Sequence, residues 1–72
     1  MKNIAEMSRY EILDALLDDG YELRSSADAA EISKVLQSSA RNGTLVWTKE
    51  HILSTNPRIQ NLIKLQIFKK DN

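Results

Sequence analysis

The stretch SRYEILDALLDDG, residues 8–20, decides the start of the fold because it carries the signals of a complete helix. Ser8 and Glu11 have the spacing of a capping box, in which each side chain accepts a hydrogen bond from the other residue's backbone N–H. Gly20 stands where helices commonly close in a left-handed conformation. On a helical wheel, the apolar side chains gather within about 160°, namely Tyr10, Ile12, Leu13, Leu16 and Leu17. The sequence therefore predicts an amphipathic helix over residues 9–19.

A short strand and a second amphipathic helix are predicted next. Residues 21–24 (YELR) alternate between apolar and polar side chains, as a strand does. Ser25 or Ser26 can then cap a helix that runs to about residue 41, where an Asn-Gly pair closes it. Its apolar side chains fall within about 140° of the wheel, namely Ala29, Ile32, Val35, Leu36 and Ala40.

The C-terminal third begins with residues 44–48 (TLVWT), which are rich in the β-branched and aromatic side chains typical of strands. Residues 57–70 are harder to interpret. As one helix, their apolar side chains would spread over about 260° and form no stripe. Read as a strand from Leu62, the chain alternates, with three large side chains on one face, namely Ile63, Leu65 and Ile67. We therefore favour a β-hairpin formed by residues 44–51 and 62–69.

Together these segments predict an α+β fold of one small domain, residues 1–72. Two N-terminal amphipathic helices would be followed by a C-terminal β-hairpin, in the order α-(β)-α-β-β. The alternative is a small all-α bundle. A chain of 72 residues is near the lower limit for folding unaided, and it has no cysteine with which to form a disulfide. We therefore expect a partner, or a second copy in a homodimer, to contribute to its stability.

The composition argues against an enzyme, a metal site and a bound cofactor. Without cysteine there is no thiol nucleophile and no Cys-based zinc or iron–sulfur site, and the absence fits a reducing, cytoplasmic location. His51 is the only histidine, so no His pair can hold a metal. Two glycines, Gly20 and Gly43, cannot make a P-loop or a dinucleotide-binding turn. The longest apolar runs are three residues, whereas a membrane helix needs about 20. We therefore expect a soluble binding protein with no membrane contact.

The charges are unevenly distributed along the chain although the formal net charge is zero. Residues 1–33 carry eight acidic and three basic side chains, for a net charge of −5. Residues 34–72 carry seven basic and two acidic side chains, for a net charge of +5. Either the fold mixes the two sets, or the protein has a basic face for an anionic partner or for head-to-tail self-association.

The first functional hypothesis is a small protein-binding modulator, such as an inhibitor or accessory factor, that occupies a partner's surface and is dimeric. Short cysteine-free chains of this kind are common among phage and plasmid accessory proteins. The acidic side of the first helix would steer the encounter, while exposed apolar side chains would anchor it. The candidate partner-binding residues are Glu11, Asp14, Asp18, Trp47, Leu62 and Phe68.

The alternative is a minimal winged-helix or helix-turn-helix-like DNA-binding regulator. The second helix would enter the major groove, where Arg and Gln commonly read guanine and adenine. The predicted hairpin would be the wing that contacts phosphates. The candidate nucleic-acid-binding residues are Lys34, Gln37, Ser38, Arg41, Lys49 and Arg58, with Lys64, Lys69 and Lys70 as further phosphate contacts.

Overall fold

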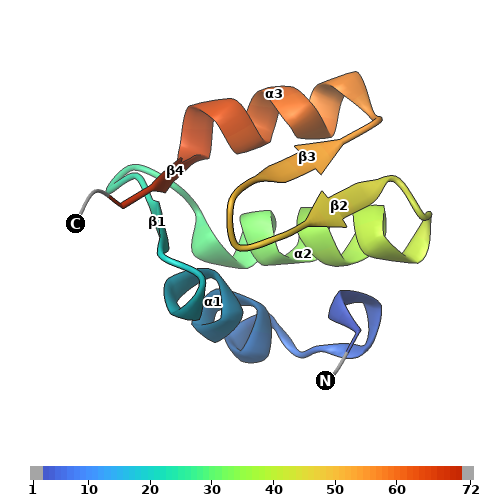
Figure 1. The fold of residues 1–72 in the computed structure, drawn as a ribbon, viewed down its shortest axis with the longest axis horizontal. Coiled ribbons are helices and arrows are strands. Elements are labelled where there is room, and N and C mark those ends of the chain that lie inside the picture. Colours follow the sequence, from blue (N-terminus) through green and yellow to red (C-terminus); the bar gives the residue numbers. More distant parts are fainter. Residues whose placement is uncertain (1–2, 71–72) are drawn as a thin grey trace.

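The computed structural model describes residues 3–70 and shows three α-helices, four short strands and one 3₁₀ turn (Figure 1). In chain order these are η1 (Ile4–Glu6), α1 (Arg9–Asp18), β1 (Tyr21–Leu23), α2 (Ala29–Arg41), β2 (Leu45–Trp47), β3 (Ile52–Ser54), α3 (Pro57–Gln66) and β4 (Ile67–Lys69). The α+β class is confirmed, and the all-helical alternative is wrong. The order, however, is α-β-α-β-β-α-β.

Helix α2 runs through the middle of the molecule. Helix α1 lies on one side of it, and the β2–β3 hairpin and α3 lie on the other (Figure 1). At one end, β1 and β4 pair antiparallel in the register Tyr21↔Lys69, Glu22↔Phe68 and Leu23↔Ile67. This strand pair joins the end of α1 to the end of α3, so the two outer helices are tied together at one end and separated by α2 along their length.

The predicted caps of α1 are confirmed. Ser8 Oγ accepts from the Glu11 N–H at 3.2 Å, and Glu11 Oε1 accepts from the Ser8 N–H at 3.0 Å. Gly20 has a φ of +85°, a conformation that L side chains rarely adopt. Its carbonyl accepts from the Lys70 N–H at 2.7 Å. The turn at Gly20 therefore ends α1 and directs the chain into β1.

The predicted N-cap of α2 is wrong by two to three residues. The residue that caps the helix is Asp28, whose Oδ1 accepts from the Glu31 N–H at 3.2 Å. Ser25 and Ser26 instead lie in a turn closed by a hydrogen bond from the Ala27 N–H to the Arg24 carbonyl, 2.9 Å long. Ser and Asp are both strong caps, so composition alone did not choose between them.

The predicted pairing of residues 44–51 with 62–69 is also wrong. Strand β2 pairs with β3, in the register Leu45↔Ser54, Val46↔Leu53 and Trp47↔Ile52. Residues 57–66 form α3, which begins with Pro57 at its first position and Asn56 Oδ1 accepting from the Arg58 N–H at 3.0 Å. The helical wheel for this segment failed because it included residues 67 and 68, which have already left the helix for β4.

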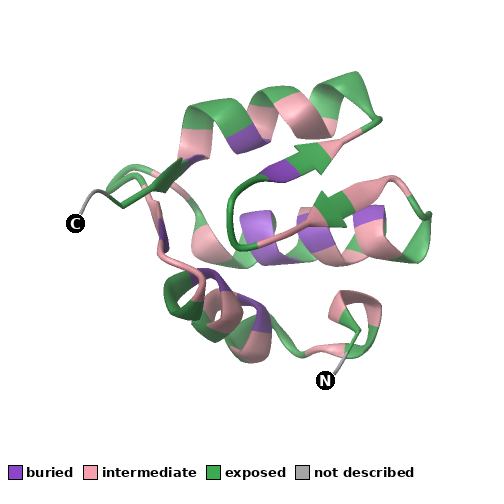
Figure 2. Ribbon diagram, in the orientation of Figure 1, coloured by how far each residue is buried: buried purple, intermediate pink, exposed green. Residues whose placement is uncertain are grey.

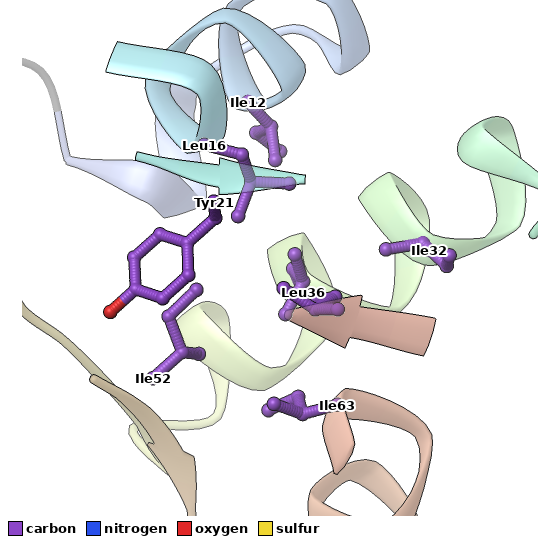
Figure 3. Packing of buried hydrophobic residues seen from close by; sticks show 8 residues of the cluster. Ile12, Leu16, Tyr21, Ile32, Leu36, Ile52 and Ile63 are labelled. Atoms are coloured by element: carbon purple, nitrogen blue, oxygen red, sulfur yellow. The ribbon is translucent and has the colours of Figure 1, made fainter. Parts of the chain in front are cut away.

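The core draws at least one side chain from each helix and from three of the four strands (Figure 2). Figure 3 shows the side chains of this cluster, and those it labels come from α1, β1, α2, β3 and α3. The buried apolar set is Ile12, Leu16, Tyr21, Ile32, Leu36, Ile52, Ile63 and Ile67. Two buried serines of α2 keep their hydrogen bonds, as buried polar groups must. Ser33 Oγ donates to the Ala29 carbonyl at 2.8 Å, and Ser39 Oγ shares a hydrogen bond of 2.6 Å with Thr44 Oγ1.

Candidate functional site

Helix α1 turns only half of its apolar arc toward the core. Ile12 and Leu16 are buried, whereas the Tyr10 side chain is 80% exposed and Leu17 is 61% exposed. Leu13 lies between these two sets and is half-buried. Figure 2 shows the buried side of α1 facing the rest of the molecule and the exposed side facing outward. Large apolar side chains grouped on a surface commonly mark a protein-binding site.

Acidic side chains lie directly beside these apolar ones. Asp14 and Asp18 are both exposed, and they follow Tyr10 by about 40° and 80° around the helix. We call the combined surface the α1 outer face, made of Tyr10, Leu13, Asp14, Leu17 and Asp18. Glu11 is half-buried, and its carboxylate takes part in the capping box. Its first role is therefore to hold the start of α1.

A shallow, mostly apolar groove continues the α1 outer face toward β1. It has a volume of about 260 Å³ and is lined by Leu13, Leu16, Leu17, Tyr21, Glu22, Leu23 and Ala29. Glu22 stands opposite Phe68 across the β1–β4 pair. The Arg24 guanidinium lies 5.8 Å from the centroid of the Phe68 ring, within the range of a cation–π contact. Phe68 is thus exposed on β4 opposite a residue that lines this groove, with the Arg24 guanidinium over its ring.

Trp47 has a structural role, although the sequence suggested it as a partner anchor. Its Nε1–H donates to Asp19 Oδ2 at 2.7 Å, which ties the hairpin to the end of α1. The Tyr21 hydroxyl donates to the Thr48 carbonyl at 3.0 Å and holds the same loop. The half-buried indole also lines a hollow of about 480 Å³ between η1, α1 and the hairpin. These contacts join residues 27 and 28 positions apart in the chain, so no local sequence signal could indicate them.

Lys69 completes this junction. Its ammonium group donates to the carbonyl oxygens of Asp19 and Lys49, and it lies 4.5 Å from the centroid of the Tyr21 ring. Helix α1 has no basic residue in its last turn. A cation at a helix C-terminus compensates the partial negative charge of the unpaired carbonyls, so Lys69 supplies from β4 the charge that α1 lacks. This residue, suggested as a phosphate contact, is thus bound within the fold.

Tyr21 makes the stability of this junction depend on pH. Burial raises the pKa of its hydroxyl above the usual value of 10.0, and the carboxylates of Asp19 and Glu50 raise it further. The unfolded chain therefore loses this proton at a lower pH than the folded one. The contribution of the Tyr21 hydroxyl to the free energy of unfolding is complete below about pH 10 and is lost as the pH rises toward the pKa of the folded state.

In urea denaturation between about pH 9 and pH 11, wild type should lose more free energy of unfolding than Tyr21→Phe. Parallel curves for the two proteins would contradict this assignment.

The candidate nucleic-acid-binding residues are divided among α2, the hairpin loop and α3, and four of them share one side of α2, namely Lys34, Gln37, Ser38 and Arg41. Gln37 Nε2 donates to the Met7 carbonyl at 2.6 Å, and Arg41 Nε donates to the Ala5 carbonyl at 3.2 Å. Two of the side chains expected to read bases therefore hold the N-terminal segment against α2. Lys34 is exposed on the same side of α2, and Lys49 is in the hairpin loop beside the Trp47 hollow. Ser38 and Arg58 share a separate groove of about 470 Å³ between α2 and α3.

The candidate partner-binding residues are also divided. Asp14 and Asp18 belong to the α1 outer face, while Phe68 lies past the adjoining groove. Leu62 packs half-buried against the core from α3. Sequence reasoning assigned Tyr10 and Leu17 to the core side of α1 and so missed them as surface residues. The signal that could have found them is the width of the apolar arc, because one helix packed on a single neighbour covers only part of about 160°.

Residues 3–70 contain no group of three or more His, Cys, Asp or Glu side chains placed to hold a metal ion. Within the same residues, no helix combines the length and apolar character needed to cross a membrane. Comparison with protein-family models, with curated proteins and with solved structures finds no match for this chain.

Proposed function

We propose that this protein is a protein-binding module that docks on its partner through the α1 outer face. The observation that carries the proposal is the exposure of Tyr10 and Leu17, 80% and 61%, directly beside the carboxylates of Asp14 and Asp18. The complementary partner surface has apolar side chains next to lysine or arginine. Such a protein acts by occupying the partner's surface, as an inhibitor or accessory factor does.

The energetics suit this role. Burying a large apolar side chain contributes about 1.5–3 kcal/mol, so Tyr10 and Leu17 together can anchor a contact. The exposed carboxylates contribute less to affinity, but they accelerate the encounter with a basic surface at low salt. The apolar pair should therefore govern dissociation, and the acidic pair should govern association.

The α1 outer face is also held rigidly from behind. The capping box fixes the first turn of the helix, Ile12 and Leu16 are buried underneath, and the Trp47–Asp19 hydrogen bond fixes its end. A surface ordered before binding loses little conformational entropy when the partner arrives. This supports a docking role for α1.

The test compares two pairs of exposed apolar residues in affinity capture from extracts of the source cells. The double variant Tyr10→Ser, Leu17→Ser should weaken capture of the partner at least about 100-fold, because each anchor contributes on the order of 2 kcal/mol. The matched control is Val46→Ser, Leu53→Ser, a pair that faces solvent from the hairpin with 49% and 46% exposure. It should capture the same partner as wild type.

Two further measurements make this test decisive. Circular dichroism should show that both double variants melt close to wild type, since substitutions at exposed positions usually change stability by less than about 0.5 kcal/mol. In the same extracts, Asp14→Asn, Asp18→Asn should slow association and reduce its salt dependence. Loss of the partner in the hairpin variant but not in the α1 variant would overturn the proposal. Retention on a DNA column that falls steeply with salt would favour nucleic-acid binding instead.

A further inference from the structure

The two outer helices carry opposite charges at opposite sides of the molecule. Helix α1 has three acidic side chains against Arg9, for a net charge of −2. Helix α3 has Arg58 and Lys64 and no acidic side chain, for a net charge of +2. Figure 1 shows α1 and α3 on opposite sides of α2 and the hairpin. For these two helices, the charge division along the chain is also a division in space.

The exposed side of α3 matches the α1 outer face in chemistry. Besides Pro57 at its first position, four residues of α3 are exposed and fall within about 120° around the helix, namely Arg58, Asn61, Lys64 and Leu65. We call them the α3 outer face. Its apolar member, Leu65, is 57% exposed and lies between the two cations in this arc. Each outer face thus combines apolar surface with charge, and the two charges have opposite signs.

We infer that the protein associates with itself head to tail, the α1 outer face of one copy docking on the α3 outer face of the next. This inference rests on the proposed binding role of the α1 outer face and names a second copy as an occupant of it. Both helices have ten residues and so match in length. In an antiparallel arrangement Leu65 meets Tyr10, and Arg58 at the start of α3 meets Asp18 at the end of α1. The opposed helix dipoles favour the same arrangement.

The position of the two faces determines the kind of assembly. An interface between two different surfaces leaves one of each free at the ends, so the assembly grows as a chain unless its geometry closes a ring. A contact between two short helices is small, and small interfaces are weak and transient. We therefore expect a dissociation constant of about 0.1–1 mM at low ionic strength. Because the partner uses the same α1 outer face, partner binding should dissolve the assembly.

The experiment follows the weight-average mass of the full chain by sedimentation equilibrium as its concentration rises. At an ionic strength of about 0.01 M, where the Debye length is about 30 Å, the wild-type mass should climb beyond that of a dimer. At about 1 M salt, where the Debye length is about 3 Å, it should stay much closer to the monomer. The charge-reversed variants Asp14→Lys, Asp18→Lys and Arg58→Glu, Lys64→Glu should each remain monomeric alone.

Mixing the two reversed variants provides the specific test, since the reversed α1 outer face of one then fits the reversed α3 outer face of the other. The mixture should regain the mass seen for wild type. The matched control replaces the first variant with one that keeps the acidic α1 outer face, neutralises the α3 outer face through Arg58→Gln, Lys64→Gln, and reverses three exposed acidic residues outside both faces through Glu6→Lys, Glu31→Lys, Glu50→Lys. Each reversal adds two charges and each neutralisation removes one, so this variant has the same net charge of +4 as Asp14→Lys, Asp18→Lys, where wild type has 0. The control mixture should stay monomeric, because both of its α1 outer faces are acidic and neither of its α3 outer faces is basic.

Three outcomes would overturn the inference. The first is a wild-type chain that is monomeric at about 1 mM and low salt, and the second is a wild-type mass that rises no further than that of a dimer. The third is a control mixture that reaches the same mass as the mixture of the two reversed variants. Self-association and the proposed function can fail independently of each other. If wild type is monomeric while Tyr10→Ser, Leu17→Ser still loses the captured partner, only self-association fails. If the mixture assembles but the α1 variant keeps its partner, only the proposed function fails.

Discussion

Leu36→Ala is expected to lower the free energy of unfolding by about 2–5 kcal/mol, about half of what a chain of this length has. Leu36 is fully buried in the middle of α2, in contact with the core cluster that joins the helices and strands (Figure 3). Removing its branched end takes apolar atoms out of contact and leaves a cavity. With about 0.05–0.15 kcal/mol of stability per residue, 72 residues amount to roughly 4–11 kcal/mol.

Urea denaturation of dilute protein, followed by circular dichroism, measures this loss. Leu17→Ala is the matched control because it deletes the same atoms from a side chain that is 61% exposed. Its free energy of unfolding should stay within about 0.5 kcal/mol of wild type. Equal losses in the two variants would contradict the division of apolar residues between core and surface on which the α1 outer face depends.

Ile63→Ala and Leu65→Ala should differ by about 2–4 kcal/mol in the free energy of unfolding. In a strand, residues 63 and 65 would share a face and both would be buried. In α3 they point in different directions, and Ile63 is 5% exposed whereas Leu65 is 57% exposed. Only Ile63→Ala therefore leaves a cavity. The same denaturation experiment distinguishes the two conformations of this segment.

Similar losses for these two variants would show that Leu65 is covered in the dilute protein, and would contradict the exposed position of Leu65 on α3. Phe68→Ala adds a second comparison from β4. Its neighbour Ile67 is buried, whereas Phe68 is exposed and has the Arg24 guanidinium 5.8 Å from its ring centroid. Ile67→Ala should therefore destabilise the fold much more than Phe68→Ala.

The elements that local signals define were predictable from the sequence. The capping box at Ser8 and the glycine at position 20 mark the ends of α1, and both depend on residues within one or two turns of each other. The strand at residues 21–23 and the closing turn at Gly43 were recognised for the same reason. The cap of α2 was misplaced because Ser25, Ser26 and Asp28 are all good caps within four positions.

The candidate site was predictable only in part. The acidic side of α1 follows directly from the helical wheel, so Asp14 and Asp18 were found. Tyr10 and Leu17 were assigned to the core side because the wheel shows which residues are apolar but not how much of the arc a neighbour covers. Trp47 was considered as an anchor, although Asp19, distant in the chain, binds its indole N–H.

By itself, the sequence determined the two N-terminal helices, the strand between them, the α+β class and the separation of charge along the chain, because each depends on the type and spacing of nearby residues. Only the tertiary structure decided that residues 57–66 are helical, that β4 pairs with β1, and that Lys69 serves the end of α1. These features depend on contacts between segments up to 50 positions apart. Such contacts form where they bury the most apolar surface over the fold as a whole. The pattern of neighbouring residues does not specify them.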